Sequence, residues 1–353
     1  MCATRSDAQT PAARKTKVAI SGESFLINGR PINEGRVYNG MKIEGLLFNS
    51  RMVQGIFDDR NAETRELWNY PDGAWDPDRN TNGFIAAMPA WRDAGLASFT
   101  INLQGGSPYG YGNPRPWWNS GFNTDGSLDP KYLARLERIL DRADELGMVP
   151  IVGLFYEAQA MRFDNEAAVC RAVDEITDWL LAKGYTNVIV EIANECNLKG
   201  FAHPIILPAR AHELIQRVKE RSKGRLLVAT SYTGGTVPSD NVLDVEDFVL
   251  LHGNGVSDPN EIRKLVERTR SNPHYHGQPI VFNEDDHYDF EKPDNNFIAA
   301  VSQHTGWGLF DFRKKQEAFD EGFQSVPCNW SPDSSERKRG FFKLLREMTG
   351  GTK

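Results

Sequence analysis

Two apolar segments that each end in a glutamate constrain this chain more than any other feature of its sequence. Residues 188–195 are Val-Ile-Val-Glu-Ile-Ala-Asn-Glu, and residues 279–284 are Pro-Ile-Val-Phe-Asn-Glu. Short, continuous apolar runs of this kind are typical of parallel strands that are covered on both faces. The two segments therefore predict buried strands that carry Glu195 and Glu284 at their C-terminal ends.

Strand-like and helix-like segments alternate through most of the chain. Strands are expected within 46–57 and at 97–103, 149–156, 188–195, 225–231, 248–252, 280–284 and 307–312, and helices at 83–94, 130–146, 165–182, 209–222, 259–270, 295–304 and 335–348. Strands separated by helices at intervals of roughly 30 residues are typical of βαβ units. This pattern predicts an α/β fold, a single (β/α)8 TIM barrel within residues 18–353.

The N-terminal part of the chain is predicted to precede the barrel. Residues 1–17 are polar and lack an apolar segment, so we expect a disordered tail. Residues 18–32 contain two short apolar segments and an Asn28-Gly29 turn, which predicts a hairpin that would cover the bottom of the barrel. Cys2 leaves two hypotheses for location: a lipid-anchored or periplasmic protein whose signal was removed, or a cytoplasmic one.

Composition excludes several classes of function. The net charge of −7 gives no basic patch for a nucleic acid. No apolar run approaches the ~20 residues that a transmembrane helix needs. The 4 cysteines contain no C-x-x-C pair, so a zinc ribbon is excluded and free thiols are expected. The oligomeric state stays open.

The predicted barrel would bring the two glutamates together. Glu195 closes the fourth strand and Glu284 the seventh, and active sites of such barrels lie at the C-terminal ends of the strands. Two carboxylates in one bowl can cleave an acetal, one as a proton donor and the other as a nucleophile or base. A carboxyl separation of roughly 5–5.5 Å gives retention of configuration, and one of roughly 6.5–9.5 Å gives inversion.

These motifs resemble those of the clan A retaining glycoside hydrolases, the superfamily that includes the family-five cellulases and mannanases. Residues 190–195 resemble the fourth-strand motif, 279–284 the seventh strand, and Gly306-Trp307-Gly308 the eighth. His252 matches a histidine at the end of the sixth strand. The resemblance covers about residues 40–350 and implies a polysaccharide-degrading enzyme that needs no cofactor and no metal.

The resemblance also implies roles for individual residues. Glu195 would be the acid/base and Glu284 the nucleophile, with Asn194 holding the sugar 2-hydroxyl beside it. His252 would orient Glu284, and Trp307 would stack under the sugar.

Three positions qualify the resemblance. Arg51 is the best placement of the early-barrel arginine of these enzymes. Cys196 stands where a proline usually follows the acid/base, and Asn254 stands where an aromatic residue is usual, which indicates a divergent branch. Independently of the family, Glu191 is expected to be a buried partner of a basic residue, since an acid is rarely buried without one.

Further candidates for substrate binding lie at strand ends and in two long loops. Aromatic rings among Gly and Pro suit the apolar faces of sugars, although a self-packed loop cluster is the alternative. Within residues 104–129 these rings are Tyr109, Tyr111, Trp117 and Trp118. The loop at residues 58–82, which contains Trp68, Tyr70 and Trp75, is expected to be functional because of its length. The candidates at strand ends are Asn102, Tyr156, Glu157 and His287, and Arg115 could recognise an acidic sugar.

The favoured hypothesis is a retaining glycoside hydrolase that cleaves a β-linked glycan by double displacement. A transglycosylase would use the same residues, and a barrel that binds a glycan without cleaving it is a third hypothesis. A metal-dependent lyase or isomerase would use Glu284, Asp286 and His252. A metal shared by Asp285 and Asp286 is disfavoured, because adjacent residues of a strand point to opposite faces.

Overall fold

The computed structural model describes residues 13–106, 108 and 116–352. Its central strands form two four-stranded sheets, with the orders β10-β9-β8-β7 and β11-β12-β13-β6, and all of their pairings are parallel. The strands are β6 (Asn49–Ser50), β7 (Ser98–Asn102), β8 (Val149–Phe155), β9 (Ile189–Ala193), β10 (Leu227–Ala229), β11 (Val249–His252), β12 (Ile280–Asp285) and β13 (Gly306–Leu309). Each lies in or beside a segment that the sequence predicted as a strand.

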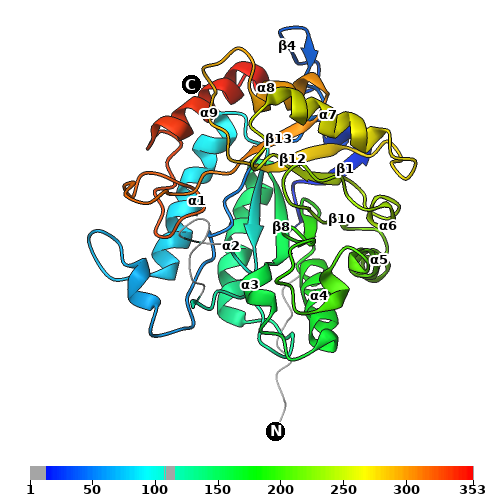
Figure 1. Cartoon of the computed structure of the whole chain (residues 1–353). Coiled ribbons are helices and arrows are strands. Elements are labelled where there is room, and N and C mark those ends of the chain that lie inside the picture. The colour runs from blue at the N-terminus through cyan, green and yellow to red at the C-terminus, as the bar shows by residue number, and fades with distance from the viewer. Residues whose placement is uncertain (1–12, 107, 109–115, 353) are drawn as a thin grey trace.

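The two sheets are joined at both of their edges. A parallel bridge pairs Arg51, directly after β6, with Thr100 in β7. At the other edge the backbone N–H of Asp247, just before β11, donates to the carbonyl of Val228 in β10 at 2.9 Å. The two sheets are therefore hydrogen-bonded to each other at both edges, helices lie around them, and this arrangement fits the predicted (β/α)8 barrel (Figure 1).

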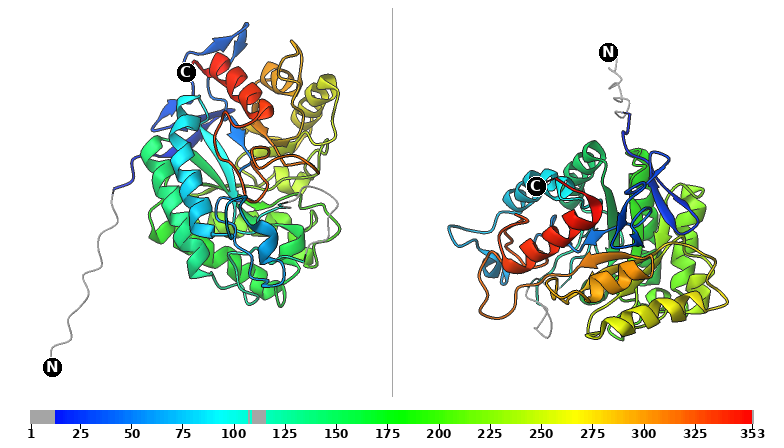
Figure 2. Two further views of the ribbon diagram at one scale, coloured as in Figure 1. Left: turned by 90° about the vertical axis from the view of Figure 1, so that its left-hand side faces the viewer. Right: turned by 90° about the horizontal axis from the view of Figure 1, so that it is seen from above.

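Helices cover the outer face of the strands. They are α1 (Pro77–Asp93), α2 (Pro130–Leu146), α3 (Glu157–Ala160), α4 (Glu166–Ala182), α5 (Ala211–Ser222), α6 (Asp240–Leu243), α7 (Pro259–Arg270), α8 (Asn296–Ser302) and α9 (Glu336–Thr349). The helix α9 lies beside α1, and the Thr352 N–H donates to the Asp93 carbonyl at 2.8 Å (Figure 2). No helix among the described residues has the length and apolar character needed to cross a lipid bilayer.

The helix α1 begins earlier than the sequence predicted. The expected start was Gly83, but the helix starts at Pro77, within what we had assigned to a long loop. The Asp76 carboxylate accepts hydrogen bonds from the N–H groups of Asp78 and Arg79, and proline is favoured in the first turn. This Asp-Pro pair is the start signal that the prediction passed over.

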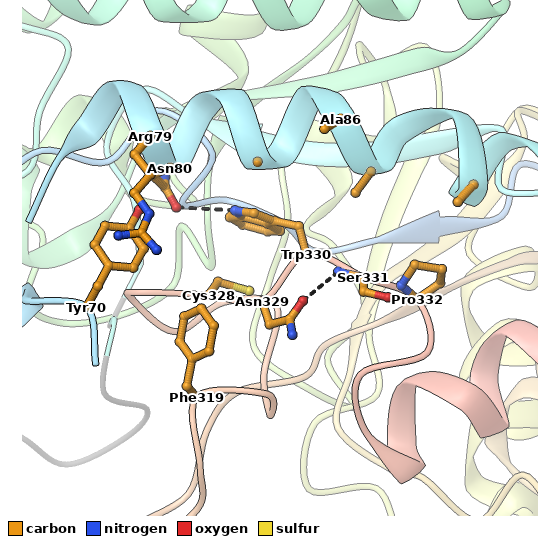
Figure 3. Close-up of a pocket in the computed structure, with 13 residues that line it drawn as sticks. Tyr70, Arg79, Asn80, Ala86, Phe319, Cys328, Asn329, Trp330, Ser331 and Pro332 are labelled. Atoms are coloured by element: carbon orange, nitrogen blue, oxygen red, sulfur yellow. Dashed lines mark hydrogen bonds between the residues drawn. The ribbon is translucent and has the colours of Figure 1, made fainter. Parts of the chain in front are cut away.

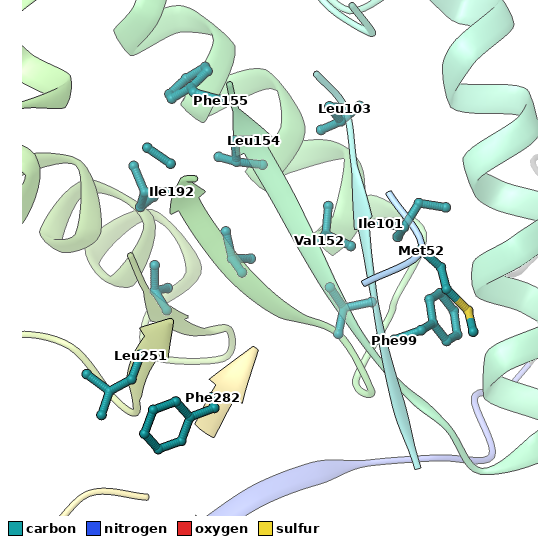
Figure 4. Close-up of a cluster of buried hydrophobic side chains, with 14 of the residues drawn as sticks. Met52, Phe99, Ile101, Leu103, Val152, Leu154, Phe155, Ile192, Leu251 and Phe282 are labelled. Carbon is teal, nitrogen blue, oxygen red and sulfur yellow. The ribbon is translucent and has the colours of Figure 1, made fainter. Parts of the chain in front are cut away.

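The hydrophobic core lies between the strands and the surrounding helices. Figure 4 shows side chains of β7, β8, β9, β11 and β12 in this core, among them Ile101, Val152, Ile192, Leu251 and Phe282. Burying a side chain of this size contributes roughly 1.5–3 kcal/mol. Because side chains alternate along a strand, the intervening residues face the other side of the strands, where the polar groups of the site lie.

A small antiparallel sheet covers the N-terminal ends of the barrel strands. It consists of β1 (Val18–Ser21), β2 (Ser24–Ile27) and β3 (Arg30–Pro31), so the predicted hairpin has a third strand. Asn28 and Gly29 connect β2 to β3 with φ values of 53° and 80°, as expected for this turn. Its buried side chains, with Phe25 among them, belong to one cluster with residues at the starts of the barrel strands.

Part of the predicted tail contacts the barrel. The Arg14 guanidinium pairs with Asp141 at 2.6 Å, and the backbone N–H of Thr16 donates to Asp144 at 2.8 Å. The ordered chain therefore begins before Val18. Cys2 lies outside the described residues, and the other three cysteines are free thiols.

Candidate active site

The C-terminal ends of the central strands bring the predicted carboxylates together. Glu284 lies in β12, His252 is the last residue of β11, and Glu195 follows β9 by two residues. Glu195 has a φ of 53°, a left-handed conformation that is uncommon for a residue with a side chain and is often found at functional sites. It is the more accessible of the two glutamates, with 15% of its side chain exposed against 5% for Glu284.

His252 lies between the two glutamates. Its Nδ1 is 3.1 Å from Oε1 of Glu195 and 3.9 Å from Oε2 of Glu284. One ligand atom from each of the three side chains lies within 4.8 Å of the others. The carboxylates that the sequence placed on separate strands thus face each other across a single imidazole.

Arg51 is the cation at the centre of the site. This fully buried side chain comes from the end of β6 and donates from Nε to Oε2 of Glu284 at 2.6 Å. Its Nη2 donates to Oδ1 of Asn194 at 2.5 Å. Arg51 therefore contacts the predicted nucleophile directly, whereas Asn194 is linked to it through the guanidinium, which holds both side chains.

Glu191 is the structural partner of this arginine. Its Oε2 lies 3.6 Å from Nη1 of Arg51, and its Oε1 accepts from the Ser231 hydroxyl at 2.6 Å. The amide of Asn283 also donates to Oε1 at 3.4 Å. The prediction that Glu191 is a buried partner of a basic residue is confirmed.

Burial and ion pairing together set the electrostatics of the site. Burial raises the pKa of Glu284, and the positive charges of Arg51 and His252 offset part of that rise. Burial lowers the pKa of His252, but the charges of Glu284 and Glu195 and the hydrogen bond to Glu195 outweigh it, so the net shift of this pKa is upward. Because a guanidinium keeps its proton, Arg51 favours the carboxylate form of Glu284 at neutral pH.

Asn254 is a site residue that the sequence analysis missed. Its Nδ2 donates to Oε1 of Glu284 at 2.7 Å, so Arg51 and Asn254 each hold one oxygen of this carboxylate. We had noted Asn254 only as a departure from the family pattern. Its position two residues after His252, at the same edge of the sheet, was the signal that it faces Glu284.

Cys196 does not bring a thiol into the site. Its side chain is buried in the hydrophobic core, and burial raises its pKa to about 12. Its backbone N–H donates to the carbonyl of Ser231 at 2.9 Å. The residue in place of the usual proline therefore packs behind the strand ends.

Trp307 contradicts its predicted role as a sugar platform. The indole has no exposed surface and stacks on Phe297 of α8, with ring centroids 4.7 Å apart and planes at 15°. Its Nε1 donates to Oδ2 of Asp285 at 3.1 Å. A side chain at Gly308, the next residue, would meet Asn49 on the inner face, so the alternation of β13 turns Trp307 outward to the helices.

Trp117 packs among other aromatic side chains of the loops. Trp117 is fully buried in a cluster with Phe57 and Trp75, and its ring meets that of Trp68 at 87°. This contradicts the predicted sugar contact of Trp117 and matches the alternative of a self-packed cluster. Trp118 is half-buried, with the guanidinium groups of Arg60 and Arg162 at 5.2 and 5.4 Å from its ring. The other candidates of this loop, Tyr109, Tyr111 and Arg115, lie outside the described residues.

The strand-end candidates of β7 and β8 lie beside the bowl. Asn102 is buried, and neither atom of its amide has a hydrogen-bond partner within the described ranges. It lies against Gly153, where an added Cβ would collide with its Oδ1. Tyr156 is close enough for its charge to affect the pKa of Arg51, whereas Glu157 begins α3 and packs on Gly200.

A second buried amide, Gln324, was not predicted from the sequence. Its backbone N–H donates to the carbonyl of Asp311 at 2.9 Å, which places it after β13. A Cβ on Gly106 would lie 2.9 Å from its Nε2 and 3.3 Å from the ring of Tyr156. Its Oε1 has no hydrogen-bond partner in the described part of the chain. No motif marks this residue, because a long loop brings it back to the bowl.

His287 is held by the residue that follows the predicted nucleophile. Its Nδ1 lies 2.7 Å from Oδ1 of Asp285, and this hydrogen bond is the main cause of its raised pKa. We expected Asp285 and Asp286 to diverge, yet one ligand atom from each lies within 4.8 Å of those of its neighbours and of His287. The prediction was wrong because β12 ends at Asp285 and its alternation does not continue.

Among the described residues, two groups of side chains have ligand types that could hold a cation: Glu195 with His252 and Glu284, and Asp285 with Asp286 and His287. In the first, Oε2 of Glu284 is already bound by Arg51, and a second cation there would be repelled. In the second, Asp285 already accepts from Trp307, Asn296 and His287.

Comparisons with known proteins give the fold. No family model matches the sequence, and no curated protein matches it. A chain from Bacteroides vulgatus ATCC 8482, described as a candidate glycoside hydrolase, has a TM-score of 0.58 and 14% identity, over 94% of this chain and 61% of that one. The endo-1,4-β-mannanase of Rhizomucor miehei has a TM-score of 0.57 and 12% identity, over 95% of this chain and 99% of that one.

The third comparison is with the GH5-4 broad-specificity endoglucanase of Clostridium longisporum, with a TM-score of 0.55 and 11% identity, over 86% of this chain and 96% of that one. At such identities the similarity concerns architecture. This protein has the fold of the family 5 glycoside hydrolases.

Proposed function

We propose that this protein is a retaining glycoside hydrolase that cleaves a β-linked glycan on a closed (β/α)8 barrel. The observation that carries the proposal is the approach of the two carboxylates, since one oxygen of Glu195 and one of Glu284 lie within 4.8 Å. This favours the spacing of retaining enzymes, roughly 5–5.5 Å, over the roughly 6.5–9.5 Å of inverting ones. A mannanase and an endoglucanase among the similar structures support a β-linked substrate.

In the first step Glu284 is the nucleophile. Arg51 and Asn254 each bind one of its oxygens, which keeps it ionised and limits its rotation. A Glu284 oxygen forms a bond to the anomeric carbon while the bond from that carbon to the leaving oxygen breaks. Glu195 gives its proton to the leaving oxygen, which departs as a hydroxyl group.

In the second step Glu195 is the base. As a carboxylate it takes a proton from a water molecule, whose oxygen bonds to the anomeric carbon and releases Glu284. The two displacements together retain the configuration. His252 holds Glu195 at 3.1 Å throughout, and its charge stabilises whichever glutamate is ionised.

The test is turnover of a panel of aryl β-glycosides and β-linked polysaccharides, with the anomer of the first product read by NMR. Glu284→Gln should lose at least about 10³-fold in kcat, the scale seen when a residue of a catalytic unit is removed. Glu195→Ala should be rescued by azide on an activated aryl glycoside. An unchanged kcat of Glu284→Gln or an inverted product would contradict the proposal.

A transglycosylase would use the same residues, with a sugar hydroxyl in place of water in the second step. Product analysis at rising acceptor concentration separates the two activities. A non-cleaving glycan-binding barrel would bind the panel without releasing product. The metal-dependent alternative predicts loss of turnover in excess chelator, and the ion pair of Arg51 with Glu284 argues against it.

A further inference from the structure

A second hollow opens among loops at the C-terminal ends of β6, β7 and β13. It has a volume of about 570 Å³. The residues that line it are Leu67, Asn69, Pro71, Pro108, Arg313, Lys314, Lys315, Gln316, Glu317, Val326 and Pro327. We call this hollow the basic pocket, because three consecutive cations line it.

The cations of the basic pocket form no ion pair with a carboxylate in the described part of the chain. Within the described residues none of Arg313, Lys314 and Lys315 forms an ion pair with a carboxylate, although most other arginines on the surface do. The acidic residue that lines the pocket, Glu317, is already bound by the Arg337 guanidinium at 2.6 Å and by the backbone N–H of Lys314 at 2.6 Å. The pocket is therefore locally positive in a chain with a net charge of −7.

Arg313 is built into the wall of the pocket. Its Nη2 donates to the carbonyl of Pro327 at 2.5 Å, and its backbone N–H donates to the hydroxyl of Ser325 at 2.7 Å. Its side chain is half-buried, and burying a charge without a counter-ion costs free energy. A bound anion would supply the missing charge, and a guanidinium can bind an oxyanion through two parallel hydrogen bonds.

The pocket is connected to the catalytic strand ends. Phe312, next to Arg313, has its ring centroid 5.3 Å from that of Phe310, whose backbone N–H donates to the carbonyl of Asp285. On the other side, Ser325 follows Gln324, which lies beside Gly106 in the bowl. Neighbouring residues therefore link the wall of the basic pocket to the catalytic strand ends, as one extended ligand bound to both would require.

A hollow of similar size along α1 differs from the basic pocket, because its cation is paired with a carboxylate. Figure 3 shows it lined by Ala86, Phe319, Cys328 and Trp330. Its cation, Arg79, makes two hydrogen bonds to the Asp72 carboxylate, at 2.9 and 3.0 Å, so its charge is balanced. This hollow offers no unpaired charge to a ligand, and the basic pocket does.

We propose that the basic pocket binds an anionic group of the substrate, a sugar carboxylate or a sulfate ester, so that the glycan cleaved at Glu195 and Glu284 is acidic. The cleavage of an acidic glycan rests on the proposed glycosidase function, whereas binding of the anion by the pocket does not. The two sources of the anion present the same oxyanion chemistry to Arg313 and the lysines.

The test uses matched oligosaccharides of β-linked glucan, mannan and xylan, each neutral, carrying uronate groups or carrying sulfate esters. Binding is measured by calorimetry on full-length Glu284→Gln, and hydrolysis on the wild-type chain. For at least one backbone, an acidic form should bind about 10-fold or more tightly than the neutral form, and the advantage should shrink as salt rises. Preference for uronate or for sulfate identifies the source.

The exposed lysines supply the decisive variants. In the same background, Lys314→Ala with Lys315→Ala should reduce the advantage of the acidic form about 3- to 10-fold and leave the affinity for neutral glycans unchanged. The charge-matched control, Lys264→Ala with Lys343→Ala, should change neither.

Equal binding of acidic and neutral forms on every backbone, or an undiminished advantage in the lysine variant, would overturn the inference. If only neutral glycans are hydrolysed, the proposed glycosidase function stands and the inference about the basic pocket fails. If acidic glycans bind more tightly but no glycan is hydrolysed, the inference about the pocket stands and the glycosidase function fails.

Discussion

The polar and the aromatic halves of the predicted site had different outcomes. Arg51, Asn194, Glu195, His252 and Glu284 all meet within hydrogen-bonding or ion-pairing distance of a neighbour in the group. Trp117 and Trp307, which were expected to bind sugar rings, are fully buried in separate hydrophobic clusters.

The difference comes from what each kind of residue requires of its surroundings. A charged side chain at the end of a strand is stabilised only where counter-charges converge, so its position follows from the strand that carries it. A large aromatic side chain gains free energy from any apolar contact that removes it from water, and a hydrophobic core competes with a binding site for it.

The largest expected effect of a single change outside the two glutamates is at Arg51. Arg51→Met leaves Glu284 and Glu191 buried without their cation, which should lower the free energy of unfolding by about 3–5 kcal/mol. The pKa of Glu284 should rise further, so the acid limb of kcat/KM should move to higher pH. Denaturant unfolding and a pH–rate profile measure the two effects.

Arg135→Met is the matched control for Arg51. Arg135 is also buried, but it donates to the carbonyl of Ile56 and has no carboxylate partner among the described residues. This variant should leave the pH profile where it is. If Arg51→Met and Arg135→Met shift the acid limb of kcat/KM by a similar amount, the ion pair of Arg51 with Glu284 does not determine the pH of that limb.

Trp307→Ala tests the aromatic half of the comparison. It should lower the free energy of unfolding by about 3–5 kcal/mol, because it empties a packed site against Phe297. Below its melting temperature the folded variant should keep the wild-type KM for a glycan. Trp307→Phe, which preserves most of the volume, should be more stable than the alanine variant. A stable Trp307→Phe variant with a KM raised tenfold or more would restore the platform hypothesis.

Asn254→Ala should have an intermediate effect on catalysis. Loss of the hydrogen bond to Oε1 of Glu284 removes a contact to a charged group worth about 1.5–3 kcal/mol, or roughly 10- to 100-fold in kcat. Because that hydrogen bond lowers the pKa of Glu284, the acid limb should again move to higher pH. Asn272→Ala, a surface change at an amide bound to Asp240, should alter neither kcat nor the profile.

The smallest effect is expected at Glu246, a buried carboxylate that forms no ion pair with any described residue, whereas Glu191 is paired with Arg51. Burial raises its pKa well above the usual value, and the backbone of Thr230 offsets only part of this. A raised pKa means that the folded state holds the proton more tightly, so stability is lost as pH rises above the unfolded value of about 4.5.

Glu246→Gln should therefore raise the free energy of unfolding at pH 7 by about 1 kcal/mol or more and flatten its fall above pH 4.5. Denaturant unfolding at pH 4 and pH 7 measures the difference. Equal free energies of unfolding for the variant and the wild type at both pH values would contradict a destabilising charge on Glu246 at pH 7.

The sequence predicted most of the fold because the strands and helices are marked by local periodicity. The bounds of α2, Pro130–Leu146, match the prediction, since Pro130 and Gly147 mark both of its ends. The start of α1 was missed because its signal lies inside a polar segment that resembles a loop. The third strand of the N-terminal sheet, only two residues long, leaves no periodicity to recognise.

By itself, the sequence determined which strands carry carboxylates at their C-terminal ends and that these ends meet on one face. Parallel strands in an α/β fold leave few other arrangements. Only the tertiary structure decided the direction of each side chain. It turned Trp307 outward, brought Asn254 and Gln324 in from loops, and bound Arg313 to the carbonyl of Pro327. Those directions depend on packing and ion pairing between segments far apart in the chain, which no local pattern records.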